Sequence, residues 1–296
     1  MNIASLALTL LAQDLVWTPK PAPDPYTGPH RAHTRLADLK ARHSGQAEWH
    51  EVIVDDELLK SVYIQMKAGS KTPRILRPDT RSWWVVVEGE VKFDIEGTPA
   101  FTAKKNAIVQ APMQTFFSYE AVGEAPALIF ETNVAQATTV YANEADVPKA
   151  AKNYMKTRLT SRRPGVFDRK NKSMTTFEEV AQGLDAGTLK GTQKIVEDDR
   201  GAANFIYGYE KNLPVLKGGE RGHYHRDSSE YWLIMAGQIR YLIEDVGVII
   251  ANPGDVVYVP RNRFHMPRWH GPTASCRLAF NGYPNLAHFF DPDLPR

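Results

Sequence analysis

The sequence predicts an all-β protein made of two similar β-barrels in tandem, with short helices only in the arm before the first barrel and in the linker between them. Two observations support this prediction. Short apolar runs with strand character, separated by polar turns, recur from Glu51 onward. Two pairs of segments also repeat at one spacing, 148 residues, which indicates an internal duplication.

The duplication is read from two pairs of segments. Residues 82–93 lie over residues 230–241, and residues 106–112 lie over residues 254–260, each at the same offset. Because a shared offset with matching residues is hard to obtain by chance, each copy is expected to fold as one barrel. The residues in register include Trp84 with Trp232, Gly89 with Gly237, and Pro112 with Pro260.

Composition places the chain among soluble globular proteins and argues against one class of partner. Hydrophobic residues make up 43% and charged residues 24% of its 296 residues, enough for a sizeable core. A net charge of +2, without a basic stripe, gives no reason to expect a nucleic-acid partner. The single cysteine, Cys276, cannot form an internal disulfide and is expected to be a small buried hydrophobe.

The N-terminus carries one segment with two interpretations. Ile3 to Ala12 is a run of ten mostly apolar residues, which suits the core of a secretory signal and is too short to span a bilayer. No Lys or Arg precedes the run, and the alternative is a helix or strand packed on the body. The run slightly favours a periplasmic or secreted protein over a cytoplasmic one, and we expect no membrane span.

These patterns divide the chain into four parts. Pro19 to Pro29 is proline-rich and predicts an extended arm, and Thr34 to Ala41 predicts a short helix. The linker is polar and basic, which is typical of a solvated segment, and Thr175 with Glu178 forms a capping box that opens a helix through Leu184. The predicted parts are the arm with the apolar run (1–50), the first barrel (51–145), the linker (146–190) and the second barrel (191–296).

Three histidines and one glutamate in the second copy have the spacing of a metal site. His223 and His225 are two residues apart, so in an extended strand their side chains point to the same face. Glu230 begins an apolar run that predicts the antiparallel return strand, which would bring its carboxylate beside both imidazoles. His265 follows a further strand and a turn. The four side chains are therefore predicted to converge on one metal ion.

This arrangement resembles the two sequence motifs of the cupin superfamily. Members of that superfamily are small β-barrels of the jelly-roll type. Asn262 stands where the second motif has a turn glycine, a tolerable exchange because Asn also adopts left-handed conformations. Gly218 lies one residue closer to the histidines than usual, and Trp269 replaces a final Asn. The matching positions are His223, His225, Glu230 and Gly237 in the first motif, and Gly254, Pro260 and His265 in the second.

The first copy lacks the donor set. Subtracting the repeat offset from the four donors leads to Ile75, Arg77, Ser82 and Phe117. One hydroxyl cannot make a metal site, and no histidine lies between His50 and His223 to replace the missing ones. The resemblance therefore implies a bicupin whose metal motif is intact only in the C-terminal barrel, with one metal per chain.

The donor set limits the metal and the chemistry. Three imidazoles and a carboxylate suit a divalent transition metal, Fe(II) or Mn(II) first because a six-coordinate ion keeps two positions open for substrate. Ni(II), Cu(II) and Zn(II) fit the same donors, although a tetrahedral Zn(II) would be filled and structural. Glu230 is also placed to serve as a catalytic base, because a carboxylate beside a bound substrate can take its proton.

Strand alternation also predicts substrate-binding residues. Trp232 and Ile234 are in phase with Glu230, and Arg221 is in phase with the two strand histidines. Arg263 precedes His265 by two residues, and either arginine could hold a substrate carboxylate or pair at the barrel rim. Tyr241 is a candidate hydrogen-bond donor or a plain strand aromatic. The remaining histidines are interpreted as solvated in the arm (His30, His33, His43, His50) or as surface or supporting residues (His270, His288).

The resemblance implies a dioxygenase acting on a small organic molecule, with decarboxylases, lyases and isomerases as alternatives on the same fold. A different class, the non-catalytic storage or sugar-binding barrel, is disfavoured because such barrels usually lose the donor residues. The resemblance also implies that two chains pair through barrel faces as a homodimer.

Overall fold

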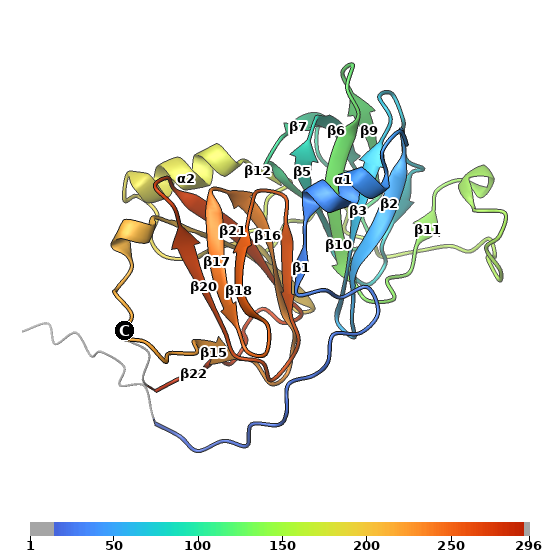
Figure 1. Ribbon diagram of the computed structural model, residues 1–296. Coiled ribbons are helices and arrows are strands. Elements are labelled where there is room, and N and C mark those ends of the chain that lie inside the picture. Colours follow the sequence, from blue (N-terminus) through green and yellow to red (C-terminus); the bar gives the residue numbers. More distant parts are fainter. Residues whose placement is uncertain (1–14, 293–296) are drawn as a thin grey trace, which may run out of the picture.

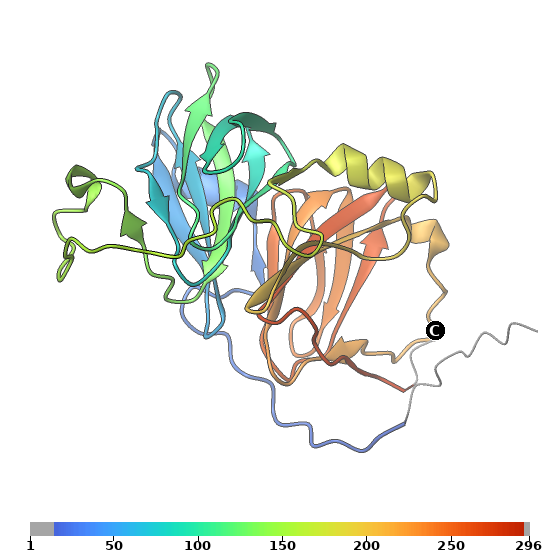
Figure 2. The same cartoon turned by 180° about the vertical axis from the view of Figure 1, so that it is seen from behind.

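Two β-barrels lie side by side in the computed structural model, which describes residues 15–292 (Figures 1 and 2). The apolar run Ile3–Ala12 lies outside the described residues. Almost all regular structure is antiparallel sheet, and the helices are short, so the predicted all-β tandem is confirmed. Within residues 15–292, no helix is long and apolar enough to cross a membrane.

The first barrel is built from two facing sheets. One has the strand order β12-β8-β5-β10-β3-β2 and the other has the order β11-β4-β9-β6-β7. Their bounds are β2 Trp49–Asp55, β3 Leu59–Met66, β4 Ile75–Leu76, β5 Ser82–Glu88, β6 Glu90–Ile95, β7 Phe101–Lys104, β8 Ile108–Ala111, β9 Phe117–Val122, β10 Ala127–Val134, β11 Val140–Tyr141 and β12 Met174–Thr175.

The second barrel has the same plan. Its sheets have the orders β1-β19-β16-β21-β14-β13 and β18-β17-β20-β15-β22. Their bounds are β1 His33–Thr34, β13 Gln193–Asp198, β14 Gly201–Gly208, β15 His223–Tyr224, β16 Glu230–Ala236, β17 Gln238–Ile243, β18 Gly247–Ala251, β19 Val256–Val259, β20 His265–His270, β21 Ser275–Asn281 and β22 Phe289–Phe290. Two 3-10 turns, η1 Glu144–Asp146 and η2 Glu210–Asn212, connect elements.

Strand registers repeat between the barrels at the spacing read from the sequence. Ile75 lies opposite Phe117, and 148 residues later His223 lies opposite His265. Trp84 lies opposite Val109 just as Trp232 lies opposite Val257. Alternation along these strands places one face inside each barrel, so the two barrels carry corresponding residues at corresponding positions.

Each barrel receives its edge strand from the segment that precedes the other barrel. β1, in the arm, pairs with β19 of the second barrel, and β12, in the linker, pairs with β8 of the first. A short helix follows each exchanged strand: α1, Leu36–Arg42, after β1 and α2, Phe177–Asp185, after β12. The N-cap of α2 is Thr176, whose hydroxyl accepts from Glu179 N at 3.2 Å, so the capping box lies one residue later than predicted.

The largest hydrophobic cluster lies between the barrels. Each barrel has its own interior cluster, around Trp84 in the first and Trp232 in the second. A third cluster joins outer faces of both barrels, where Tyr231 stacks on Phe280 with ring centroids 4.9 Å apart and Phe130 packs against Phe280 at 5.7 Å. Burial of this aromatic surface holds the two barrels together as one body.

The arm is held by a buried carboxylate of the second barrel. Asp255 Oδ1 accepts from the Leu36 backbone N–H at 2.9 Å, which caps α1, and Asp255 Oδ2 lies 2.9 Å from His33 Nε2. His43 stacks on Trp49 at 4.4 Å. The interpretation of these two histidines as solvated is therefore wrong. His33 contacts Asp255 and His43 contacts Trp49, and no local sequence pattern indicated either contact.

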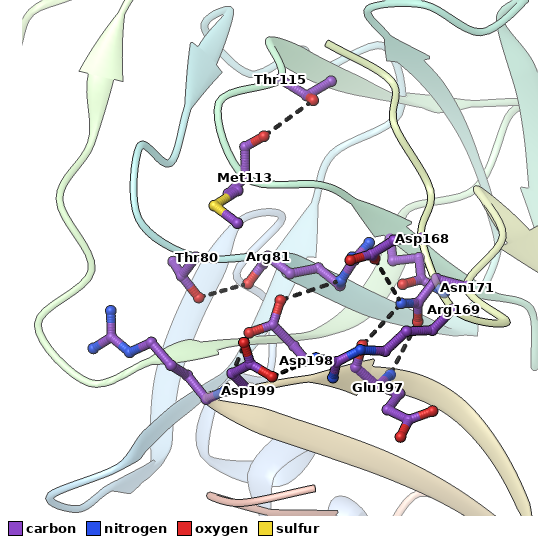
Figure 3. Close-up of polar contacts among 12 residues, drawn as sticks. Thr80, Arg81, Met113, Thr115, Asp168, Arg169, Asn171, Glu197, Asp198 and Asp199 are labelled. Atoms are coloured by element: carbon purple, nitrogen blue, oxygen red, sulfur yellow. Dashed lines mark hydrogen bonds and ion pairs between the residues drawn. The ribbon is translucent and has the colours of Figure 1, made fainter. Parts of the chain in front are cut away.

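The linker is also more firmly held than a solvated segment. Arg81, only 4% exposed, lies at the junction of the first barrel, the linker and the β13–β14 hairpin, with Asp168 at 2.9 Å and Asp198 at 3.6 Å (Figure 3). Asn171 of the linker donates from Nδ2 to the Glu197 carbonyl oxygen at 2.8 Å, and its Oδ1 accepts from the Glu197 backbone N–H at 2.9 Å. These contacts tie the linker to both barrels.

Candidate metal centre

The four predicted donors meet at one end of the second barrel. His223 lies on β15, His225 follows it, and Glu230 and His265 are the first residues of β16 and β20. Pairing of β15 with β20 places His223 directly opposite His265. Within residues 15–292, these residues form the one group of three or more His, Cys, Asp or Glu side chains suited to hold a metal ion, with donor atoms all within 4.8 Å.

Two special backbone conformations bring these strands together. Gly222 has φ +85°, and a Cβ at this position would collide with the carbonyl oxygen of His265. Only glycine therefore allows the close approach of the first histidine strand. Asn262 has φ 63° and its N–H donates to the His225 carbonyl oxygen at 2.7 Å, so it adopts the left-handed turn expected of it.

Glu230 lies at the centre of the group. Its Oε2 atom is 3.1 Å from His225 Nε2, 3.3 Å from His265 Nε2 and 3.9 Å from His223 Nε2. Donors at about 2.0–2.2 Å from one ion are about 3 Å apart when they occupy adjacent positions. The observed separations are thus those of donors that share an ion.

Backbone contacts set the tautomers of two imidazoles. His225 Nδ1 lies 2.9 Å from the Ala287 carbonyl oxygen, and His265 Nδ1 lies 3.0 Å from the Arg263 carbonyl oxygen. Because a carbonyl oxygen only accepts, each Nδ1 carries a proton. In a neutral imidazole the Nε2 lone pair then points at an anionic oxygen of Glu230. Two lone pairs and a carboxylate repel one another unless a proton or a metal ion lies between them. Burial would lower the pKa of His225, but its hydrogen bond with Glu230 outweighs burial and raises it, so a bound metal would take the place of a proton on Nε2.

The charge states favour metal binding. Burial would raise the pKa of Glu230, but the three histidines around its carboxylate outweigh burial and hold it well below the usual range. Burial, reinforced by the charge of His265, lowers the pKa of His223 to about 3. His223 Nε2 is buried without a hydrogen-bond partner. A carboxylate and a neutral imidazole with a free buried lone pair are the forms that ligate divalent transition metals.

Sequence reasoning missed two residues that orient the carboxylate. Asn281 on β21 lies opposite Glu230 and donates from Nδ2 to Glu230 Oε1 at 3.2 Å. Asn204 on β14 donates in turn to Asn281 Oδ1 at 3.0 Å. The internal repeat could have indicated Asn281, because an asparagine, Asn133, stands at the equivalent position 148 residues earlier. Asn133 contacts Ser82, which is the counterpart of Glu230.

The last strand of the second barrel and the segment before it also belong to the site. β22 pairs with β15, and the segment before it supplies the Ala287 carbonyl oxygen to His225. The His288 ring lies 4.5 Å from the ring of His225, and the Phe290 ring lies 5.0 Å from that of His223. His288 is exposed, so this segment lies between the donor group and solvent.

Three of the predicted substrate-binding residues face the barrel interior. Trp232 is 1% exposed and its ring lies 5.3 Å from that of His265. Tyr241 packs on Trp232 at 5.0 Å, and Ile234 lies one strand position deeper in the same cluster. These residues extend from the donor group into the barrel.

The two predicted arginines have other partners. Arg263 donates to the Glu244 carbonyl oxygen at 2.6 Å and its guanidinium lies over the ring of Tyr26, in the arm. The guanidinium of Arg221 pairs with Asp291 at 3.0 Å and lies over the Phe264 ring at 4.3 Å. Both guanidinium groups therefore hold chain segments around the site, and Arg263 reaches the donor group only through its backbone carbonyl, which contacts His265.

The corresponding end of the first barrel carries no donor set. Ile75 and Phe117 occupy the positions of His223 and His265. Arg77 donates to the hydroxyl of Thr139, and Ser82 Oγ donates to Asn133 Oδ1 at 2.5 Å. At this end of the first barrel, hydrophobic side chains and hydrogen-bonded polar side chains stand where the second barrel has its four donors.

Fold and site together define the class of this protein: a tandem β-barrel protein with a metal-type donor set in its second barrel. The cupin domain model matches residues 215–280, a segment that contains all four donors. Residues 215–280 are thus a cupin domain, which confirms the resemblance carried by the two motifs.

Solved structures share the fold over most of the chain. Salicylate 1,2-dioxygenase from Pseudoaminobacter salicylatoxidans is 10% identical with a TM-score of 0.64, and the match covers 88% of this chain and 84% of that one. A variant of oxalate decarboxylase from B. subtilis is 15% identical with a TM-score of 0.52, covering 91% and 81%. These likenesses show the fold alone. None of the curated protein sequences is significantly similar to this chain.

Proposed function

We propose that this protein is a mononuclear metal-dependent enzyme of the dioxygenase type, with one divalent transition metal held by His223, His225, Glu230 and His265. The observation that carries the proposal is the tautomer pattern: two Nδ1–H groups are bound to backbone carbonyls, and the opposite lone pairs face one carboxylate. A cation resolves this repulsion. Fe(II) or Mn(II) suits three imidazoles and a carboxylate best, and Ni(II), Cu(II) and Zn(II) fit the same donors.

A divalent transition metal held there by the three histidines and Glu230 would supply Lewis-acid and redox chemistry for a reaction between an organic substrate, which would be the source of the electrons, and O₂. The chain's own residues have separate tasks. The carbonyls of Ala287 and Arg263 fix two imidazoles, and Asn281 fixes one oxygen of the carboxylate. Glu230 remains ionised because its pKa is low, so it can accept a proton from a substrate hydroxyl. Trp232 and Tyr241 are proposed to line the substrate side of the site.

A decarboxylase or related lyase is the second candidate, supported by the structural likeness to oxalate decarboxylase. The same donor residues would serve both reactions, and consumption of O₂ distinguishes them. A non-catalytic sugar-type binding protein is disfavoured by the complete donor set. The homodimer and the export suggested by residues 3–12 stay predictions.

Two measurements test the proposal. Metal analysis of the purified protein should find transition metal, and oxygen electrode traces should show O₂ uptake with a member of a panel of phenols, diketones and thiols. Release of CO₂ from a carboxylic acid without O₂ uptake would favour the lyase. A protein that binds no transition metal after reconstitution with Fe(II) and Mn(II) would overturn both readings.

A further inference from the structure

A buried arginine, Arg277, lies inside the second barrel, which holds the four metal donors. Arg277 is on β21, opposite Ile234 on β16 and Ile206 on β14, and both isoleucines belong to the interior of the second barrel. Cross-strand neighbours point to the same face, so Arg277 also points inward. Its neighbours along the strand, Cys276 and Leu278, belong to the cluster between the barrels, as alternation requires.

The guanidinium of Arg277 has no partner among residues 15–292. The residue is 9% exposed, and its Nε is buried without a hydrogen-bond acceptor. The two other buried arginines of residues 15–292 each have an acidic partner: Arg81 pairs with Asp168 and Asp198, and Arg263 pairs with Asp245 and with backbone carbonyls. A buried charge without a counter-ion is costly, which indicates that something outside the described chain pairs with it.

A second unpartnered polar group lies beside it. Tyr241 is fully buried, and its hydroxyl has no hydrogen-bond partner. Arg277 interacts electrostatically with Tyr241, Glu230 and Cys276. Burial raises the pKa of the Tyr241 phenol and of the Cys276 thiol, so both are neutral and Glu230 is the one anion of the three. Glu230 already faces three imidazoles and Asn281, which leaves Arg277 and Tyr241 as two free donors in one interior.

The metal-free barrel provides an internal comparison. At the positions of Arg277 and Tyr241 the first barrel has Ile129 and Phe93, both buried and apolar. At the position of Ala279 it has Glu131, which fills the interior and accepts from Trp84 Nε1 at 2.6 Å and from the Tyr119 hydroxyl at 3.2 Å. The second barrel thus has donors where the first is apolar, and a small side chain where the first has a partly buried carboxylate.

The charges inside the second barrel indicate the sign of the charge on a ligand that would pair with Arg277. A divalent cation and Arg277 contribute three positive charges, and Glu230 supplies one negative charge. The barrel interior would then hold two uncompensated positive charges, and an anionic ligand would neutralise them.

We propose that the second barrel binds a small organic carboxylate, with the carboxylate held by Arg277 and the Tyr241 hydroxyl and the remainder of the molecule extending to the metal. This inference rests on the proposed metal site and narrows its substrate class. Arg277 is four residues from Asn281 along β21, about 13 Å at 3.3 Å per residue, which limits the ligand to a small molecule.

The test compares carboxylates with neutral amides of the same shape. Isothermal titration of Mn(II)-loaded protein with benzoate, salicylate and oxalate is matched by benzamide, salicylamide and oxamide, and metal content is measured for each sample. At least one carboxylate should bind the wild type at least tenfold more tightly than its amide. Arg277→Ile and Tyr241→Phe, which install the residues of the metal-free barrel, should each weaken carboxylate binding at least about tenfold and leave bound Mn(II) unchanged.

Arg240→Ile is the matched control, because Arg240 neighbours Tyr241 on β17 but points to the opposite face of the strand. It should keep the preference for carboxylates. If Arg277→Ile fails to fold, Arg277→Lys should keep weak carboxylate binding and Tyr241→Phe should still reduce it.

The outcomes separate this inference from the proposed function. The inference is overturned, and the metal site spared, if the wild type binds Mn(II) but none of the carboxylates. It is also overturned if Tyr241→Phe and whichever Arg277 variant folds bind the carboxylates as tightly as the wild type does. Carboxylate binding that needs Arg277 in a protein unable to hold any transition metal supports the anion site and overturns the proposed enzyme.

Discussion

At the scale of single residues, Glu230 has two proposed roles that one substitution separates. Glu230→Gln keeps the size and a neutral oxygen donor but removes the negative charge and the proton acceptor. We expect most of the metal to be retained while turnover falls by roughly 10²–10⁴-fold, the usual effect of losing a general base. His223→Ala should instead lose metal and activity together, measured by metal analysis beside a turnover assay.

If Glu230→Gln loses metal as completely as His223→Ala, Glu230 is a ligand only. If both variants keep metal and activity, the site proposed in the second barrel is wrong.

Asn281 provides a second prediction at this scale. Asn281→Ala removes the donor to Glu230 Oε1 at 3.2 Å, so the carboxylate loses its fixed orientation. Metal affinity should fall about 10–100-fold, as is typical when a residue that orients a ligand is removed. Competition with a chelator measures the change. Asn285→Ala, on the exposed loop after β21, is the control and should leave the affinity unchanged.

The four donors could be predicted from the sequence because their spacing depends on local geometry: alternation along one strand, a hairpin return and a turn. The supporting residues could not, because Asn281 and Ala287 reach the site through strand pairing with distant segments. The phase argument also failed at Arg263, since β20 begins at His265 and alternation does not extend across the preceding turn.

At the scale of elements, Asp255 joins the arm to the second barrel. Asp255→Ala removes the acceptor for the Leu36 N–H, for His33 and for the Asn252 N–H, all at 2.9 Å. The free energy of unfolding should fall by roughly 1–3 kcal/mol, because buried donors are left unpaired. Urea denaturation measures this loss. Asp38→Ala, on the exposed face of α1, should change stability by less than about 0.5 kcal/mol.

The same contact predicts a pH dependence. Burial would raise the pKa of Asp255, but the hydrogen bonds from His33 and the backbone outweigh burial and lower it. A carboxyl whose pKa is depressed by folding stabilises the protein above its unfolded pKa of about 3.9, and that contribution disappears as the pH falls through the folded value. The stability difference between wild type and Asp255→Ala should therefore be constant near pH 7 and shrink below about pH 4.

The helices after β1 and β12 could be placed from local signals, within a residue or two. The exchange of the strands themselves could not be predicted. β1 and β12 are two residues long, too short for a periodic pattern, and their partners are chosen by the packing of whole barrels.

At the scale of the whole molecule, we expect one metal per chain. The first barrel has Ile75, Arg77, Ser82 and Phe117 where the second has donors, so reconstitution with excess Fe(II) or Mn(II) should give one tightly bound equivalent, removed by His265→Ala. Two tight equivalents, the second lost in Arg77→Ala, would contradict the assignment.

The aromatic cluster between the barrels predicts a shared stability. Phe280→Ala should reduce the free energy of unfolding by about 3–5 kcal/mol, because Phe280 is fully buried against both barrels. Tryptophan fluorescence reports on both barrels through Trp84 and Trp232, and both should still unfold in one transition. Val248→Ala, with Val248 52% exposed on β18, is the control and should have little effect. Separate transitions in the wild type would contradict the joint core.

The tandem architecture was the most predictable feature. A duplicated sequence predicts two copies of one fold, which local patterns of hydrophobicity cannot do. Trp84 and Trp232, 148 residues apart, do occupy equivalent strand positions.

The exchanged edge strand has a consequence for the order of events during synthesis. His33 leaves the ribosome early, but its partner in the sheet is Val257, close to the other end of the chain. At 5–20 residues per second, the arm waits on the order of ten to forty seconds before the second barrel can be completed. In the later part of this interval, once Phe130 has emerged, the nascent chain carries the apolar face around Tyr63 and Phe130 without its cover. Demand for chaperones should therefore be greatest late in translation, after the first barrel has already emerged.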